Sequence, residues 1–238
     1  APKGSMMMPR NTSRPMIKTK NSKLKRAFYA LLAMVIVISV IVIIEPTRKE
    51  IIGAYNNIRP KLLSGGGSTC IERLKKQGVE LSIRADFFDG LCGIHNPVLV
   101  HGFSSTKLNS PALLSCPTAS AFNELLTEID AKSVTHIGTY NCRQQRRSRV
   151  MSEHSFGTAI DITKIDGASV SRDWNQPNEK GKILQSAYKT ACKHFTNVIT
   201  PDDDALHHDH FHLDNGLGFG CKLKPLIKSV NNLLTLSF

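Results

Sequence analysis

The chain has 238 residues, enough for one domain of ordinary size with appendages, and a formal net charge of +12. Residues 1–26 carry +8 of that charge and contain no Asp or Glu, so only +4 remains for the rest of the chain. Because the charge is concentrated in one tail, it does not favour the nucleic-acid-binding class for the folded part.

An uncharged apolar stretch, AFYALLAMVIVISVIVII, follows this tail at residues 27–44. As a helix it would be about 27 Å long, close to the hydrocarbon core of a membrane at about 30 Å. The alternative is a cleaved signal peptide, but its apolar region would be shorter and would end in small residues, whereas this one continues into Glu45-Pro46. We expect a single transmembrane helix with the basic tail in the cytoplasm and everything after residue 45 outside.

All six cysteines come after the apolar stretch. An even number confined to the exported part indicates three disulfides formed in an oxidising compartment. A thiolate metal site is the alternative, although the chain has no C-x-x-C pair. The pairing cannot be chosen from the sequence, and the candidates are Cys70, Cys92, Cys116, Cys142, Cys192 and Cys221.

The rest of the chain divides into a stalk with a Gly/Ser linker at 45–69, a globular domain at 70–223 and a tail at 224–238. Apolar spacing in the domain predicts an α+β fold, with a small antiparallel sheet and flanking helices. The predicted helices are 70–77, 117–131 and 180–195, and the predicted strands are 96–103, 134–140, 158–165, 197–201 and 210–215.

The run HHDHFHLD, at 207–214, holds four of the nine histidines. Imidazole is the commonest protein ligand for metals. In a strand, side chains alternate between faces, so His208, His210 and His212 would point the same way and Asp209 the other way. A surface tract or a tag remnant is the alternative, but a tag would lie at a terminus and lack interleaved Asp and Phe.

Further ligands must come from elsewhere, and SEHSFGTAID at 152–161 is the strongest candidate. His154 and Asp161 are too far apart for one helical turn. Their spacing fits a loop that turns at Gly157 and enters a strand carrying Asp161. Taken alone this pair is weak evidence, because a core histidine and an exposed carboxylate explain it equally well.

Several motifs occur in the order found in a known family: LCGIHNPVLV, LNSPALLSCPTA, GTYNCR, RVMSEHSFGTAIDI, the Asp173-Trp174 pair, ACKHFTNVITP and HHDHFHLD. The chain resembles the extensin-like C-terminal domain over roughly 70–221. Through S-x-H-x-x-G-x-A-x-D and H-x-H it also resembles the zinc metallopeptidases that include D-Ala-D-Ala peptidases, lysostaphin-type endopeptidases and the hedgehog domain. The basic run RQQRRSR at 143–149 departs from the neutral loop that the resemblance leads one to expect, which leaves the substrate preference open.

The resemblance implies a Zn²⁺ ion held by His154, Asp161 and His212, with an open position for an activated water. His210 is the expected general base, with Asp209 second unless a bulge reverses their order. Arg143 would bind a substrate carboxylate or stabilise the oxyanion. His207 and Ser152 are expected to contact the substrate or a ligand, and His208 to be exposed.

These expectations describe a zinc peptidase that cleaves stem peptides of peptidoglycan, anchored in a bacterial inner membrane with its catalytic domain in the periplasm. An endopeptidase acting on cross-links is favoured over a carboxypeptidase, because the enzyme is tethered. One alternative is a non-catalytic wall-binding or scaffolding module of an envelope complex. The other is a nucleic-acid-binding protein, which the exported topology and the absence of aromatics in the basic run disfavour.

Overall fold

The computed structural model describes residues 28–36, 39, 50–51, 54, 67–146, 148–216 and 220–221. The chain divides into two compact units, Ala1–Glu50 and Ile51–Phe238. Residues 28–36 of the first unit are helical. Among the described residues, no helix is both long enough and apolar enough to cross a membrane. The predicted tails at 1–26 and 224–238 and most of the 27–44 span and the 45–69 stalk lie outside the described residues.

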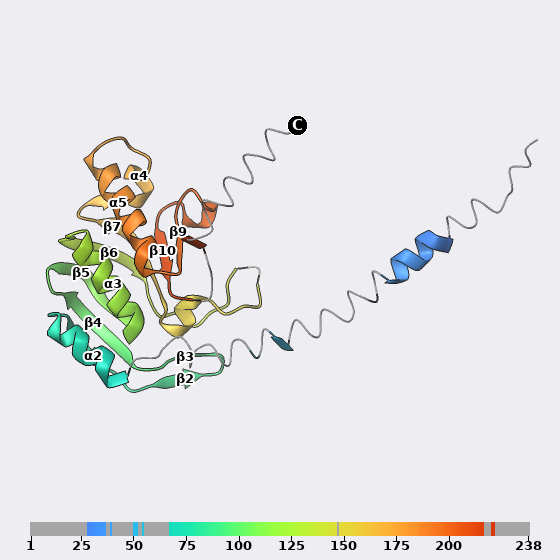
Figure 1. Cartoon of the computed structure of the whole chain (residues 1–238), viewed down its shortest axis with the longest axis horizontal. Helices are drawn as coiled ribbons and strands as arrows, with labels where there is room; N and C mark the ends of the chain where they lie inside the picture. Colours follow the sequence, from blue (N-terminus) through green and yellow to red (C-terminus); the bar gives the residue numbers. More distant parts are fainter. Residues whose placement is uncertain are drawn as a thin grey trace, which may run out of the picture. The chain divides into compact units, whose positions relative to one another are not determined.

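The second unit is built around one eight-stranded sheet in the order β1-β4-β5-β6-β7-β10-β9, with β8 paired to β7 (Figure 1). All pairs are antiparallel except β5 with β6, which α3 connects as a crossover. Strands β2 and β3 form a separate hairpin. The strands are β1 Glu80–Ile83, β2 Phe87–Asp89, β3 Cys92–Ile94, β4 Pro97–Phe103, β5 Thr106–Ser115, β6 Ser133–Gly138, β7 Ala159–Ile165, β8 Ala168–Ser169, β9 Asn197–Ile199 and β10 Phe211–Asp214. The helices are α2 Gly67–Lys76, α3 Cys116–Glu128, α4 Val170–Asp173 and α5 Glu179–His194, with 3-10 turns η1 Glu153–Phe156 and η2 Ala205–His207.

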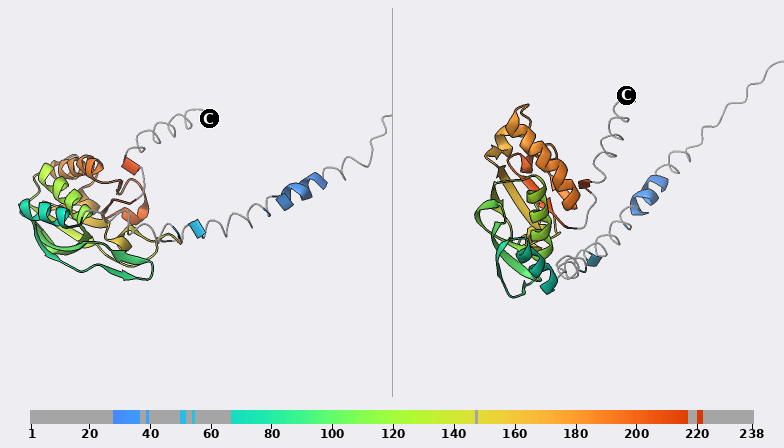
Figure 2. Two further views of the ribbon diagram at one scale, coloured as in Figure 1. Left: turned by 60° about the horizontal axis from the view of Figure 1, so that its bottom comes forward. Right: turned by 60° about the vertical axis from the view of Figure 1, so that its left-hand side comes forward.

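Helices α2, α3 and α5 lie side by side over one face of the sheet, and the core lies between the two layers (Figure 2). Alternate residues of β7 and β10 enter this core, namely Ile160, Ile162, Phe211 and Leu213, all at most 1% exposed. The residues between them, Asp161 and His212, must therefore face the opposite side of the sheet, because successive strand side chains alternate. The fold thus separates an apolar face from a polar one.

The predicted α+β class with a mostly antiparallel sheet is confirmed. Each predicted helix and strand is present, with ends shifted by at most three residues. Helix α2 begins at Gly67, inside the predicted Gly/Ser linker, which corrects that boundary. Glycine is a poor helix former, but burial of Cys70, Ile71 and Leu74 anchors the helix and overrides local propensity.

Strand β5 was not predicted. Its sequence, TKLNSPALLS, contains a proline and several polar residues, and its middle is exposed. That pattern is compatible with a strand because one face of the sheet is not covered by helices, so polar side chains are tolerated there.

The prediction of three disulfides among the six cysteines is confirmed. Cys70–Cys116 joins α2 to the start of α3, and Cys92–Cys142 joins β3 to the loop after β6. Cys192–Cys221 joins α5 to the segment that follows β10. The second and third bridges fix segments on either side of the polar face described next.

Candidate metal centre

His154 is placed by the short turn η1 and by the glycine that ends it. Gly157 has φ +64°, a left-handed conformation that favours glycine. A Cβ at this position would lie 2.5 Å from Ile94 Cδ1 and 3.0 Å from the Ser115 amide nitrogen, so the close approach also excludes a side chain. The predicted turn at Gly157, followed by a strand carrying Asp161, is what the structure has.

Asp161 and His212 are direct partners across the antiparallel pair β7–β10. On the other side of β7, Gly138 of β6 lies opposite Asp161. A Cβ on Gly138 would be 3.1 Å from Asp161 Oδ2, so the glycine leaves room for the carboxylate. The sheet register therefore sets the positions of two of the three predicted ligands.

The structure brings His154, Asp161 and His212 together, with one ligand atom from each within 4.8 Å of the others. His154 Nε2 is 3.1 Å from Asp161 Oδ2 and 3.2 Å from His212 Nδ1. His212 Nδ1 is 2.8 Å from Asp161 Oδ1. Three donors of the types that zinc prefers thus converge on one point.

The opposite nitrogen of each histidine has its own acceptor. His154 Nδ1 lies 2.5 Å from the backbone oxygen of Thr139, and His212 Nε2 lies 3.1 Å from Asp214 Oδ2. These acceptors assign the ring proton to the outer nitrogen in each neutral histidine, which leaves His154 Nε2 and His212 Nδ1 as lone-pair donors. Metal-binding histidines are characteristically held in this way, so the residues fit a metal ion.

In the absence of metal, burial and neighbouring charges shift the pKa values of Asp161 and His212 in opposite directions. Burial acts to raise the pKa of Asp161, but its close contacts with the His154 and His212 rings hold that pKa well below its usual range. Burial acts to lower the pKa of His212, but the carboxylates of Asp161 and Asp214 raise it to about 9. His212 therefore carries an extra proton at neutral pH, and an incoming metal ion must displace it.

Asp214 is part of the site although the sequence analysis gave it no role. Asn197 Nδ2 donates to Asp214 Oδ1 at 2.9 Å, and the Gly216 amide donates to the same oxygen at 2.8 Å. The other carboxylate oxygen accepts from His212. The sequence could have indicated this role for Asp214, because it follows His212 by two residues in a predicted strand and side chains two apart share a face.

Asp214→Ala is expected to weaken zinc binding by about 10- to 100-fold, since it removes the group that fixes the His212 ring. The measurement is the zinc dissociation constant from competition with a chelator. Asp202→Ala, which removes an exposed carboxylate of the chain, is the control and should bind zinc like the wild type. An Asp214→Ala protein that is folded by circular dichroism and has wild-type affinity would contradict the assignment.

A cavity of about 510 Å³ opens beside the ligand cluster, with Asp161 and His212 on its wall. Its wall includes four other residues predicted for the site, which are Arg143, Ser152, His207 and His210, together with Glu153, Asn197 and Leu206, which were not predicted. His207 is half-buried, and burial lowers its pKa, although the Asp204 carboxylate 3.0 Å from its Nδ1 acts against that. The cavity is large enough for part of a peptide to lie against the ligand cluster.

His210 stands at the edge of the ligand cluster. Its Nε2 is 3.9 Å from Asp161 Oδ1, and its Nδ1 donates to Asp209 Oδ1 at 2.7 Å. That hydrogen bond holds the pKa of Asp209 below its usual value. Asp209 is not on the cavity wall, and it orients His210 instead.

The predicted strand 210–215 is present with ends shifted by one residue, but the side-chain alternation expected from residue 208 onward does not apply before Phe211. β10 begins at Phe211, and η2 precedes it, because the Asp204 side chain accepts from the Leu206 amide and favours a helical turn. His208 lies in the turn after η2, and it is exposed as expected. Asp209 was expected to point away from His210 as in a regular strand, and the turn brings it to the His210 ring instead.

Arg143 and Ser152 are tied to each other through the backbone. The Ser152 amide donates to the Arg143 carbonyl at 2.9 Å, and Ser155 Oγ accepts from the Arg143 amide at 3.0 Å. Ser152 is buried, whereas Arg143 is exposed at the cavity wall. This network fixes the loop that carries Arg143 to the turn that carries His154.

A family model described as "Extensin-like protein C-terminus" matches residues 68–222, which is more than half of the chain. No curated protein and no solved structure matches the chain. The matched range begins next to the first residue of α2 and contains every residue of the metal centre.

Proposed function

Since the chain belongs to the family of extensin-like protein C-termini, and since His154, Asp161 and His212 converge with metal-ligand chemistry, we propose that it is a zinc peptidase that cleaves peptide bonds in peptidoglycan. The convergence of these three side chains is the observation that carries the proposal. The ligand set also supports a relationship with D-Ala-D-Ala peptidases, lysostaphin-type endopeptidases and the hedgehog domain.

Two neutral imidazoles and one carboxylate are the ligand set of a catalytic rather than a closed structural zinc site. A zinc ion held there supplies Lewis-acid activation of water and of the scissile carbonyl. His210 is the proposed general base, because its Nε2 lies beside the ligand cluster and can accept a proton from the attacking water. Asp209 holds the His210 ring in place through the hydrogen bond from Nδ1.

Arg143 lies at the wall of the same cavity and stabilises negative charge on the substrate or on the developing oxyanion. His207 and Ser152 are the proposed substrate contacts on other parts of the wall. The endopeptidase reaction is favoured over carboxypeptidase trimming, because a tethered enzyme facing a cross-linked mesh reaches internal bonds.

The proposed location is the periplasmic side of a bacterial inner membrane. It is supported by the basic tail at 1–26 followed by the apolar stretch at 27–44, and by the three disulfides of the domain. In this arrangement the basic tail is cytoplasmic and the catalytic domain faces peptidoglycan.

The test is digestion of purified sacculi and defined muropeptides with the full chain in detergent. We expect about one zinc per chain, release of peptide fragments detectable by mass spectrometry, loss of release after chelation and recovery when zinc is restored. Bound zinc with no cleavage of any muropeptide would contradict the hydrolase and favour a wall-binding module.

A further inference from the structure

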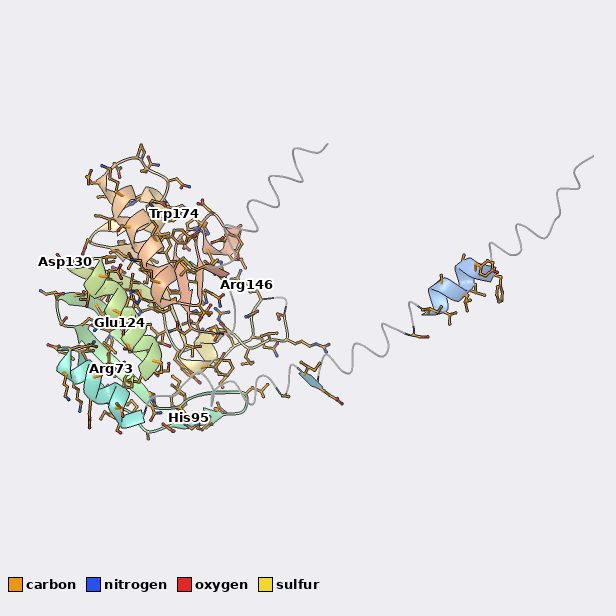
Figure 3. All side chains as sticks on the ribbon, in the orientation of Figure 1. Arg73, His95, Glu124, Asp130, Arg146 and Trp174 are labelled. Carbon is orange, nitrogen blue, oxygen red and sulfur yellow. A yellow bond between two sulfur atoms is a disulfide. The ribbon has the colours of Figure 1, made fainter. Side chains whose placement is uncertain are left out.

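The cavity beside the metal centre has a cationic section with two arginines, Arg143 and Arg146, and only Arg146 has no role in the proposed chemistry. It is formed by the loop after Cys142, from which Arg143, Gln145 and Arg146 reach the cavity wall. Figure 3 places Arg146 on this loop, where the loop extends past the edge of the sheet. Within the described part of the chain, no carboxylate forms an ion pair with Arg146.

The loop is held at both ends. Cys142 is bonded to Cys92, which is 1% exposed, and Met151 at the other end is 5% exposed. Between them Gln144 and Met151 form an antiparallel bridge, and the Gln145 amide donates to the Val150 carbonyl at 2.9 Å. Arg146 therefore follows a backbone segment that is held by the Gln144–Met151 β-bridge. Because this segment is already ordered, the backbone loses less conformational entropy when a ligand binds Arg146.

The charges on the cavity wall are unevenly distributed. The carboxylates are each engaged: Asp161 and Asp214 contact the histidine ligands, Asp204 caps η2, and Glu153 Oε2 accepts from Thr158 Oγ1 at 2.7 Å. The guanidinium of Arg146 has no such protein partner among the described residues, so its charge is available to an anion in the cavity. A guanidinium recognises a carboxylate through paired N–H donors, which gives it directional selectivity.

We propose that Arg146 is a specificity-determining residue that selects peptides bearing a free carboxylate close to the scissile bond. This proposal rests on the proposed peptidase function, and it adds a substrate feature that the ligand set does not dictate. The carboxylate comes either from the C-terminus of a stem peptide or from an acidic side chain within it. Both sources present the same chemistry to the guanidinium.

The experiment compares matched fluorescent peptides that differ in one group. One pair ends in an acid or an amide, and a second pair carries a side-chain carboxylate or its amide next to the cleavable bond. Binding to the zinc-loaded full chain is measured by anisotropy, and cleavage is measured separately. The pair for which the wild type prefers the acid identifies the source of the carboxylate.

Arg146→Ala is expected to reduce the preference for the acid peptide by about fivefold, while affinity for the amide stays unchanged. Arg146→Lys should retain part of the preference, because the charge remains without the paired donors. Arg149→Ala is the control: Arg149 is exposed on the same loop but is not on the cavity wall. The preference should also decrease at high salt, since the contact is solvent-exposed.

Equal affinity of the wild type for acid and amide in both pairs, or an unchanged preference in Arg146→Ala, would overturn the assignment. Binding of no peptide would overturn it as well. Acid-selective binding that depends on Arg146, without cleavage of any peptide, would support the assignment while contradicting the proposed hydrolase. The two proposals can therefore fail separately.

Discussion

His212→Ala is expected to abolish both stoichiometric zinc binding and muropeptide cleavage. His212 contributes one of three converging ligand atoms, and the two that remain, from His154 and Asp161, do not make a catalytic zinc site. The loss should exceed the roughly 10- to 100-fold effect of outer residues, because a ligand is removed and not merely its support.

This substitution also removes the cation that lies between Asp161 and Asp214. Removing one partner of a buried charged cluster typically costs about 3–5 kcal/mol, so the free energy of unfolding of the variant must be measured. Asp161→Asn is the second variant, because it keeps the shape of the side chain while weakening metal coordination. His208→Ala is the control, since His208 is exposed, hydrogen-bonds through its ring to the Ala205 carbonyl and is not one of the converging ligands.

The measurements are zinc content by elemental analysis and fragment release by mass spectrometry. A folded His212→Ala protein that keeps one zinc per chain and cleaves muropeptides at the wild-type rate would contradict the assignment of His212 as a ligand. Cleavage by both ligand variants would contradict the metallopeptidase as a whole.

His210→Ala is expected to lower kcat by about 100- to 10,000-fold while zinc content stays near one per chain. His210 Nε2 is 3.9 Å from Asp161 Oδ1, close enough to the ligand cluster to accept a proton there. It is not one of the three converging ligands, so its removal should separate catalysis from metal binding.

Asp209→Asn is the companion variant. It keeps an oxygen for the His210 Nδ1–H group but removes the charge, so a smaller loss in kcat is expected, with KM nearly unchanged. His210→Ala with wild-type kcat would contradict the general-base assignment. A loss of zinc from His210→Ala would instead identify His210 as a fourth ligand.

The three ligands could be selected from the sequence because their spacing and residue types match a recognised motif order. The position of Asp161 directly across from His212 could not be predicted from the sequence. It depends on the pairing of β7 with β10, which lie about 50 residues apart in the chain. The hydrogen bond from His154 to Thr139 could not be predicted either, since the acceptor is a backbone oxygen that any residue would supply. The role of Asp214 could have been predicted, because strand periodicity places its side chain on the same face as that of His212.

The errors at the histidine run and at β5 share a physical cause. In both segments, polar side chains form hydrogen bonds with backbone groups or distant residues, and these bonds outweigh the secondary structure that the local hydrophobic pattern predicts. The Asp204 side chain caps η2 and delays the strand until Phe211. In β5, Asn109 Oδ1 accepts from the His136 amide, so a polar side chain joins β5 to β6.

Among the strands that the structure describes, β10 is the last in chain order, yet it lies inside the sheet, between β7 and β9. A ribosome makes the chain from its N-terminus, so His154 and Asp161 emerge long before His212. A nascent chain therefore lacks a complete ligand set until His212 has been made and β10 has paired with β7. In the proposed zinc enzyme the three ligands converge only in the folded chain, so a bound ion would stabilise the folded state by mass action. The order of synthesis delays the proposed hydrolytic activity until the domain is finished.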